Sequence, residues 1–119
     1  SLADGSANRH SLQHISWPNG LQVLQLDNNR IDSYENVVFP DNLVTLLLRN
    51  VGMTGNKLKQ IAFPAALRHL YLDDNAIDCY ENVPFPNQLS VLTLRNVDMD
   101  AVKLRQIAFP RSLTVLDLE

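Results

Sequence analysis

The sequence predicts an α/β solenoid, in which short repeats stack so that each one covers the apolar face of its neighbour. Two observations predict this fold class. Residues 15–60 align with residues 61–106 without a gap, and 25 of the 46 positions are identical. A period of roughly 20–50 residues is the sequence signature of a repeat architecture. Five aromatic–proline pairs also recur with spacings of 22, 24, 22 and 24 residues: Trp17-Pro18, Phe39-Pro40, Phe63-Pro64, Phe85-Pro86 and Phe109-Pro110.

Each repeat carries leucines in the pattern L-x-x-L-x-L. The L-x-L part places two leucines on one face of a short strand, because successive side chains of a strand point to opposite faces. One strand per repeat, entered the same way each time, requires parallel strands joined by a crossover on the other side. The five sets are Leu21/Leu24/Leu26, Leu43/Leu46/Leu48, Leu67/Leu70/Leu72, Leu89/Leu92/Leu94 and Leu113/Leu116/Leu118.

The crossovers are predicted to be short. NKLKQIAF at 56–63 and VKLRQIAF at 102–109 favour a single helical or 3₁₀ turn in the 24-residue repeats. SYENV at 33–37 and CYENV at 79–83 take the equivalent place in the 22-residue repeats. The aromatic ring then fills the outer side, and proline restricts φ where the chain turns back toward the next strand.

The stretch LRHLYLDDNAI at 67–77 resembles the leucine-rich-repeat motif L-x-x-L-x-L-x-x-N-x-L. The resemblance recurs five times in phase and covers nearly the whole chain. It implies a right-handed superhelix with a parallel β-sheet on the concave side and short turns or 3₁₀/helical turns on the convex side. The Phe-Pro step before each strand is similar to a variant found in leucine-rich repeats of some protist kinases and receptor-like proteins.

Two repeats depart from the family pattern at its asparagine. Asn29 and Asn75 match it, and the family's asparagine hydrogen-bonds neighbouring backbone along the stack. Val51 and Val97 take the same position in the alternate repeats and cannot do so. The neighbouring Asn50 and Asn96 are candidates to compensate.

The chain is predicted to be one domain, 1–119, because its length suffices for one core. We expect a partial, degenerate repeat at the N-terminus and an incomplete one at the C-terminus, without capping units. The terminal strand would then expose Leu113, Leu116 and Leu118, either because the chain is a fragment of a longer protein or because its ends associate. The predicted divisions are 1–14, 15–36, 37–60, 61–82, 83–106 and 107–119.

A charge ladder is predicted at the residue after the third leucine of each strand. Parallel neighbours lie about 4.8 Å apart, so each arginine is expected between two carboxylates. Alternating charges are expected to set the register of the 46-residue pair. The alternative, which is compatible with the first, is that some of these charges contact a partner. The ladder reads Asp27, Arg49, Asp73, Arg95 and Glu119.

The concave face is the predicted site for a protein partner. Leu47 and Tyr71 are expected on adjacent strands, and an apolar or aromatic centre with a charged rim is typical of protein interfaces. The resemblance implies a non-catalytic protein-recognition scaffold. The alternative is a structural module that dimerises or stacks through its uncapped ends. The predicted partner-binding residues are Leu47, Arg49, His69, Tyr71, Asp73, Val91, Thr93 and Arg95.

Composition argues against several other classes of function. The formal net charge is −3 and basic residues are dispersed, which disfavours nucleic acid and anionic membranes. No apolar run approaches the roughly 18 residues that a membrane span needs. The N-terminal residues lack the apolar segment of a signal peptide. The single Cys79 and the absence of an Asn-x-Ser/Thr sequon favour a cytoplasmic protein.

No catalytic residue, metal ligand or cofactor is predicted, so we do not expect an enzyme. GMTGNK at 52–57 lacks the spacing and the Ser/Thr of a phosphate-binding loop. His10 and His14 have helical spacing but no third ligand in phase. His69 and Cys79 are expected on opposite sides of the fold and would not form a nucleophile–base pair.

Overall fold

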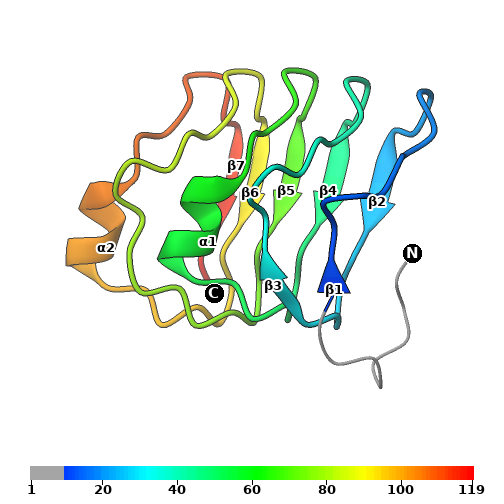
Figure 1. The fold of residues 1–119 in the computed structure, drawn as a ribbon. Coiled ribbons are helices and arrows are strands. Elements are labelled where there is room, and N and C mark those ends of the chain that lie inside the picture. Colours follow the sequence, from blue (N-terminus) through cyan, green and yellow to red (C-terminus); the bar gives the residue numbers. More distant parts are fainter. Residues whose placement is uncertain (1–9) are drawn as a thin grey trace.

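The computed structural model describes residues 10–119, which are organised around a five-stranded parallel sheet (Figure 1). Its strands lie in chain order, and equivalent residues of successive repeats pair in register. The predicted parallel sheet of an α/β protein is confirmed. The strands are β2 (Val23–Gln25), β4 (Thr45–Leu47), β5 (His69–Tyr71), β6 (Val91–Thr93) and β7 (Val115–Asp117).

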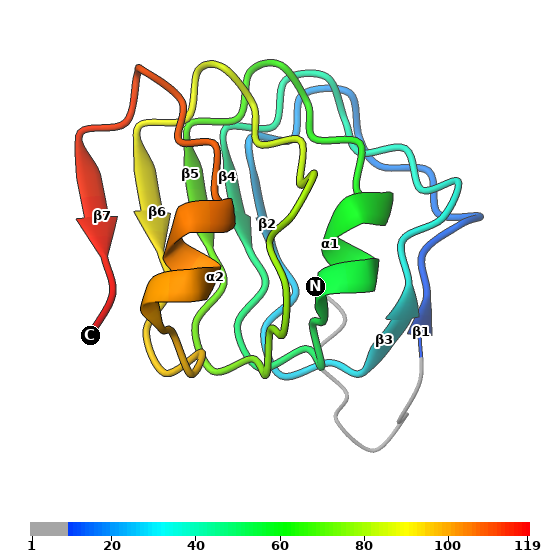
Figure 2. The same ribbon diagram turned by 90° about the vertical axis from the view of Figure 1, so that its left-hand side faces the viewer.

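The connections carry the remaining elements on one side of the sheet (Figures 1 and 2). Helices α1 (Gly55–Gln60) and α2 (Ala101–Gln106) confirm the helical turns predicted in the 24-residue repeats. Each begins at a capping residue, Thr54 or Asp100, whose side-chain oxygen accepts a hydrogen bond from the amide three residues later. The 22-residue repeats have turns at 35–36 and 81–82 instead.

A short second sheet lies on the helix side. Its strands are β1 (His10–Ser11) and β3 (Ile31–Ser33), which pair in parallel, and β3 contacts α1. The first nine residues of the predicted partial repeat 1–14 lie outside the described residues.

The core consists mainly of the repeated leucines. Leu46, Leu70 and Leu92, at the centres of three inner strands, are completely buried. Leucines of the third position are also completely buried, namely Leu26, Leu48, Leu72 and Leu94. Burying one such side chain stabilises the fold by about 1.5–3 kcal/mol, so the stacked repeats hold one another together.

The residue that follows each charged position is asparagine or aspartate because the backbone there is left-handed. Asn28, Asn50, Asp74 and Asn96 have φ values of 64°, 54°, 61° and 55°. Asparagine and aspartate tolerate this backbone conformation better than other residues with a side chain. The repeated pairs Asp-Asn, Arg-Asn and Asp-Asp therefore combine a charge with a turn residue that ends each strand.

The buried side chain of Asn75 makes hydrogen bonds to the backbone of its own repeat and of the preceding repeat. Its Nδ2 donates to the carbonyl oxygens of Leu48, Leu72 and Asp73 at 2.8–3.1 Å. Its Oδ1 accepts from the amides of Val51 and Met53, both at 3.0 Å. The repeat that contains Val51 thus donates two backbone amides to the asparagine of the next repeat.

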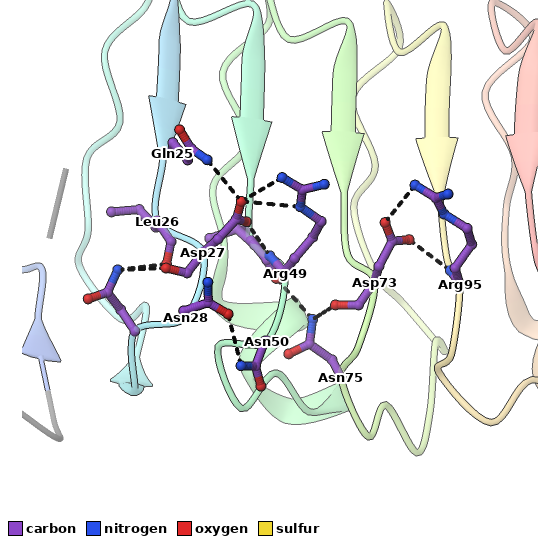
Figure 3. A network of polar contacts seen from close by, with 11 residues as sticks. Gln25, Leu26, Asp27, Asn28, Arg49, Asn50, Asp73, Asn75 and Arg95 are labelled. Carbon is purple, nitrogen blue, oxygen red and sulfur yellow. Dashed lines mark hydrogen bonds and ion pairs between the residues drawn. The ribbon is translucent and has the colours of Figure 1, made fainter. Parts of the chain in front are cut away.

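The side chains of Asn50 and Asn96 do not take over that role. Their Nδ2 atoms instead donate to exposed side chains, those of Asn28 at 2.9 Å and Asp74 at 3.0 Å. These contacts link neighbouring left-handed turns at the surface, and Figure 3 shows the one between Asn50 and Asn28. The buried amides of Val51 and Met53 depend on Asn75.

Glutamines at the ends of the helices join each helix to the preceding repeat. Oε1 of Gln60 accepts from the Tyr34 amide, and Oε1 of Gln106 accepts from the Tyr80 amide, both at 2.9 Å. Both tyrosine rings are buried, and their hydroxyl groups have no hydrogen-bond partner. Burial raises the pKa of both hydroxyls, so the phenols remain neutral.

Gly55 allows α1 to pack closely against the following repeat. A Cβ at this position would lie 2.6 Å from the carbonyl oxygen of Cys79, so a side chain would force the backbones apart. The equivalent residue of α2 is Ala101, which is exposed. The glycine of the first helix therefore reflects a close approach that α2 does not have to accommodate.

The C-terminal strand is the least covered part of the sheet. Leu116 in β7 is 38% exposed, whereas the equivalent Leu92 is completely buried and Leu24 is 4% exposed. Leu113 and Leu118 are partly buried. The exposure predicted for the terminal leucines is thus largest at Leu116.

Candidate functional site

We call the side of the five-stranded sheet opposite α1 and α2 the open face. Strands β2, β4 and β5 show alternating burial, with the central leucine buried in the core and the flanking residues on the open face. Strand register arranges the flanking residues in two rows across the sheet. The first row is Val23, Thr45, His69, Val91 and Val115, and the second is Gln25, Leu47, Tyr71, Thr93 and Asp117.

A third row lies two residues beyond the end of each strand and contains the predicted charge ladder. Backbone hydrogen bonds continue the pairing there: the amides of Asn28, Asn50 and Asp74 donate to the carbonyl oxygens of Arg49, Asp73 and Arg95 at 2.9–3.1 Å. The ladder residues are therefore held at the spacing of neighbouring strands. Their side-chain geometry decides which charges pair.

The centre of the open face combines an aromatic ring with aliphatic groups. Leu47 and Tyr71 are direct register partners, as predicted, and both are half-buried. Next to them, the Thr45 hydroxyl and His69 Nδ1 are 2.9 Å apart and hydrogen-bonded. Val91 is the neighbour of His69 in the first row. The result is a small amphipathic surface on β4, β5 and β6.

Arg49 connects this centre to the charged row. Its guanidinium carbon lies 5.8 Å from the centroid of the Tyr71 ring, within the range of a cation–π interaction. The same guanidinium donates to Asp27 Oδ2 through Nε at 3.1 Å and through a terminal nitrogen at 2.8 Å. The carboxylate thus holds Arg49 beside the tyrosine ring.

Asp27 also contacts the backbone of the next repeat. Its Oδ1 accepts from the Arg49 amide at 2.8 Å, and its Oδ2 accepts from Gln25 Nε2 at 3.3 Å (Figure 3). Burial opposes ionisation of this carboxyl, but the hydrogen bonds from Arg49 outweigh burial and lower the pKa of Asp27. Hydrogen bonding to Asp27 raises the pKa of Arg49. Both groups are therefore charged at neutral pH.

Arg95 makes the equivalent contacts one 46-residue period later. Its amide donates to Asp73 Oδ1 at 2.8 Å, and its guanidinium lies 3.4 Å from Asp73 Oδ2 (Figure 3). Its Nε is also 3.7 Å from Asp117 Oδ2. Arg95 accordingly lies between two carboxylates.

The ladder differs from the prediction in its pairing. The second carboxylate beside Arg95 is Asp117 of β7, not Glu119. Arg49 directs its hydrogen bonds to Asp27 and interacts with Asp73 through longer-range attraction. The reason is that Asp27 and Asp73 each accept a hydrogen bond from the arginine amide of the next repeat. This contact places the second carboxylate oxygen next to the guanidinium of the same arginine.

Two predicted partner-binding residues have little exposed surface. Asp73 is 3% exposed, because its carboxylate turns inward to accept from the Arg95 amide, and Thr93 is 5% exposed. These two residues can shape the open face but offer a partner little direct contact. The other predicted residues are half-buried or exposed on this face: Leu47, Arg49, His69, Tyr71, Val91 and Arg95.

Asp117 is a polar group of the open face that the predicted site omitted. It takes the place in the second row that Leu47, Tyr71 and Thr93 occupy in the preceding strands. The signal was present in the sequence, because the last strand reads VLDL where the others have an uncharged residue before the third leucine. Only the geometry places Asp117 beside Arg95.

The groups that resemble catalytic chemistry lie apart. His69 bonds to Thr45 on the open face, whereas Cys79 lies against Gly55 at the start of α1. Within residues 10–119, no three His, Cys, Asp or Glu side chains are placed to hold a metal ion. A hollow of about 530 Å³ beside Phe85 and Phe109 is lined by apolar residues, Asn87 and Arg111.

Comparison with protein-family models, with curated proteins and with solved structures finds no match to this chain. Across the described part of the chain, no helix is long and apolar enough to cross a membrane. The capacity of the open face to bind a ligand must therefore be judged from its own side chains. The open face has an aromatic and aliphatic centre, which is bordered by arginines that are ion-paired with aspartates.

Proposed function

We propose that this protein is a leucine-rich-repeat solenoid that binds a protein partner through the open face, which is its concave side, and that it is not an enzyme. The observation that supports the proposal is the placement of Leu47 and Tyr71 side by side on β4 and β5. The phase of the leucine pattern and the one-sided connections support the solenoid. A cytoplasmic location is part of the proposal and is favoured by the free Cys79.

The charged row makes this centre suitable for recognition. Arg49 is held by two guanidinium hydrogen bonds to Asp27, so little side-chain entropy remains to be lost when a partner binds. Aromatic residues and arginine are enriched among residues that dominate binding energy, especially near the centre of an interface. A polar rim around Tyr71 also matches the usual anatomy of a protein interface.

Tyr71→Ala tests this proposal. We expect the variant to fold and to bind peptides selected on the unaltered protein about 1–3 kcal/mol more weakly, because the central aromatic contact is lost. The measurement is the affinity of peptides selected from a random phage-displayed library on the purified protein. Circular dichroism and thermal unfolding establish that the variant is folded.

Val38→Ala is the matched control. Val38 is 77% exposed and lies in the connection between β3 and β4, outside the three rows of the open face. Its substitution also removes apolar surface, yet we expect selected peptides to bind it as they bind the unaltered protein. Peptides that bind Tyr71→Ala with unchanged affinity would argue against the open face as the binding site.

A second candidate function is self-assembly through β7. The exposure of Leu116 and Val115, at 38% and 48%, supports it, because an uncovered edge strand can pair with another chain. A unit of this kind would dimerise or stack rather than bind a different protein.

Molar mass distinguishes this second candidate. If β7 self-associates, light scattering across about a hundredfold range of concentration should show a mass that rises above 13.4 kDa. Leu116→Lys should restore the monomer, because a charge at the edge opposes pairing. A mass of one chain at every concentration would exclude self-assembly.

A further inference from the structure

The open face is unequally charged along its length. Across its three rows, four carboxylates face two guanidinium groups. On the β2–β4 side, Asp27 is matched by Arg49. On the β6–β7 side, Arg95 is shared by two carboxylates, and Glu119 follows without an ion pair to either arginine. Within the described residues, the carboxylates of Asp73 and Asp117 thus share the single guanidinium of Arg95.

Asp117 is the least satisfied of the three aspartates. Its side chain is 37% exposed, against 9% for Asp27 and 5% for Asp73. Asp27 and Asp73 each accept from an amide of the following repeat. Asp117 takes a different position in its repeat, and its Oδ1 accepts from the amide of Glu119. Its Oδ2 faces Arg95 at 3.7 Å, a separation too long for a strong hydrogen bond.

Apolar groups border this carboxylate. Val115 and Val91 are register partners in the first row, next to the second-row pair of Asp117 and Thr93. Val115 is 48% exposed and Val91 is half-buried. The hydroxyl of Thr93 is buried and has no hydrogen-bond partner. Val91 and Val115 thus lie side by side in the row next to an exposed carboxylate.

This combination matches the chemistry of a lysine or arginine side chain. Such a side chain can lay its methylene stem on apolar surface while its charged end reaches a carboxylate. Hydrogen bonds between an ionised donor and a carboxylate are stronger than neutral ones. The exposed carboxylate would also attract a basic partner during encounter, with an effect that decreases as salt increases.

We propose that the partner of the open face is a basic polypeptide segment, and that one of its lysine or arginine side chains binds Asp117 across Val91 and Val115. This inference rests on the proposed function, since it names the partner class for the same surface. The exposed Glu119 adds to the attraction.

The test uses peptides selected from a random phage-displayed library on the unaltered protein. Those whose binding depends on Tyr71 should be enriched in lysine and arginine. Asp117→Asn should weaken their binding about tenfold, since a charge-assisted contact is lost. Raising NaCl from about 50 to about 500 mM should weaken binding to the unaltered protein more than to the variant.

Asp41→Asn is the matched control, because it removes the same charge from an exposed residue outside the open face. It should leave binding unchanged, and Asp117→Glu, which keeps the carboxylate, should retain most of it. Thermal unfolding shows whether each variant is folded.

The outcomes separate the two proposals. Tyr71-dependent peptides that lack basic residues and bind Asp117→Asn as tightly as the unaltered protein would overturn the inference and leave the proposed function standing. A failure to obtain any Tyr71-dependent peptide would overturn both. Peptides that depend on Tyr71, on Asp117 and on low salt would support both.

Discussion

Asn75→Ala is expected to lower the free energy of unfolding by about 2–5 kcal/mol. The substitution leaves the buried amides of Val51 and Met53 without their shared acceptor, and each such group costs about 1–3 kcal/mol. It also removes the donor to the Leu48 carbonyl, which crosses from one repeat to the next. Urea denaturation followed by circular dichroism measures the change.

Asn42→Ala is the control for this effect. Asn42 also links two repeats, but through a single exposed hydrogen bond of 3.1 Å to the carbonyl of Asn19. Water can replace this bond, so we expect a change within about 0.5 kcal/mol. If Asn75→Ala were no more destabilising than Asn42→Ala, the asparagine would not hold the repeats together as inferred.

Leu70→Ala is expected to destabilise the fold by about 3–5 kcal/mol. Leu70 is completely buried at the centre of β5, with a strand on either side. Removing most of its side chain loses apolar burial and leaves a cavity that neighbouring backbone cannot easily fill. The same denaturation experiment gives the magnitude.

Leu116→Ala should cost much less, about 1.5 kcal/mol or below, although it is the same substitution at the same position of the repeat. Leu116 is 38% exposed, so part of its side chain gains little from folding and water can enter the space left behind. Equal losses at Leu70 and Leu116 would indicate that the β7 edge is covered in solution, as self-association would require.

Much of the fold was predictable because it repeats. The L-x-L alternation predicted the position and direction of strands such as β4 and β5, and the period predicted that they are parallel. The helical turns were predicted from NKLKQIAF and VKLRQIAF, and they appear as α1 and α2. Patterns of this kind are local and recur, so their signal accumulates along the chain.

The candidate site was predictable only in outline. Alternation along the strands was enough to bring Leu47 next to Tyr71. The pairing of Arg95 with Asp117, and the burial of Asp73 and Thr93, depend on side-chain torsions and on hydrogen bonds to the neighbouring backbone. A sequence period does not contain these quantities.

The sequence by itself determined the repeat, the parallel strands, the leucine core and the alternation of Asp and Arg. Those features follow from which residues face inward and how often the chain returns, and both depend on residue spacing alone. The tertiary structure decided that Asn75 hydrogen-bonds to two repeats and that Gly55 permits a close helix contact. It also decided that Asp117 lies 3.7 Å from Arg95. The physical reason is that hydrogen bonds and ion pairs depend on distances of a few tenths of an ångström between repeats.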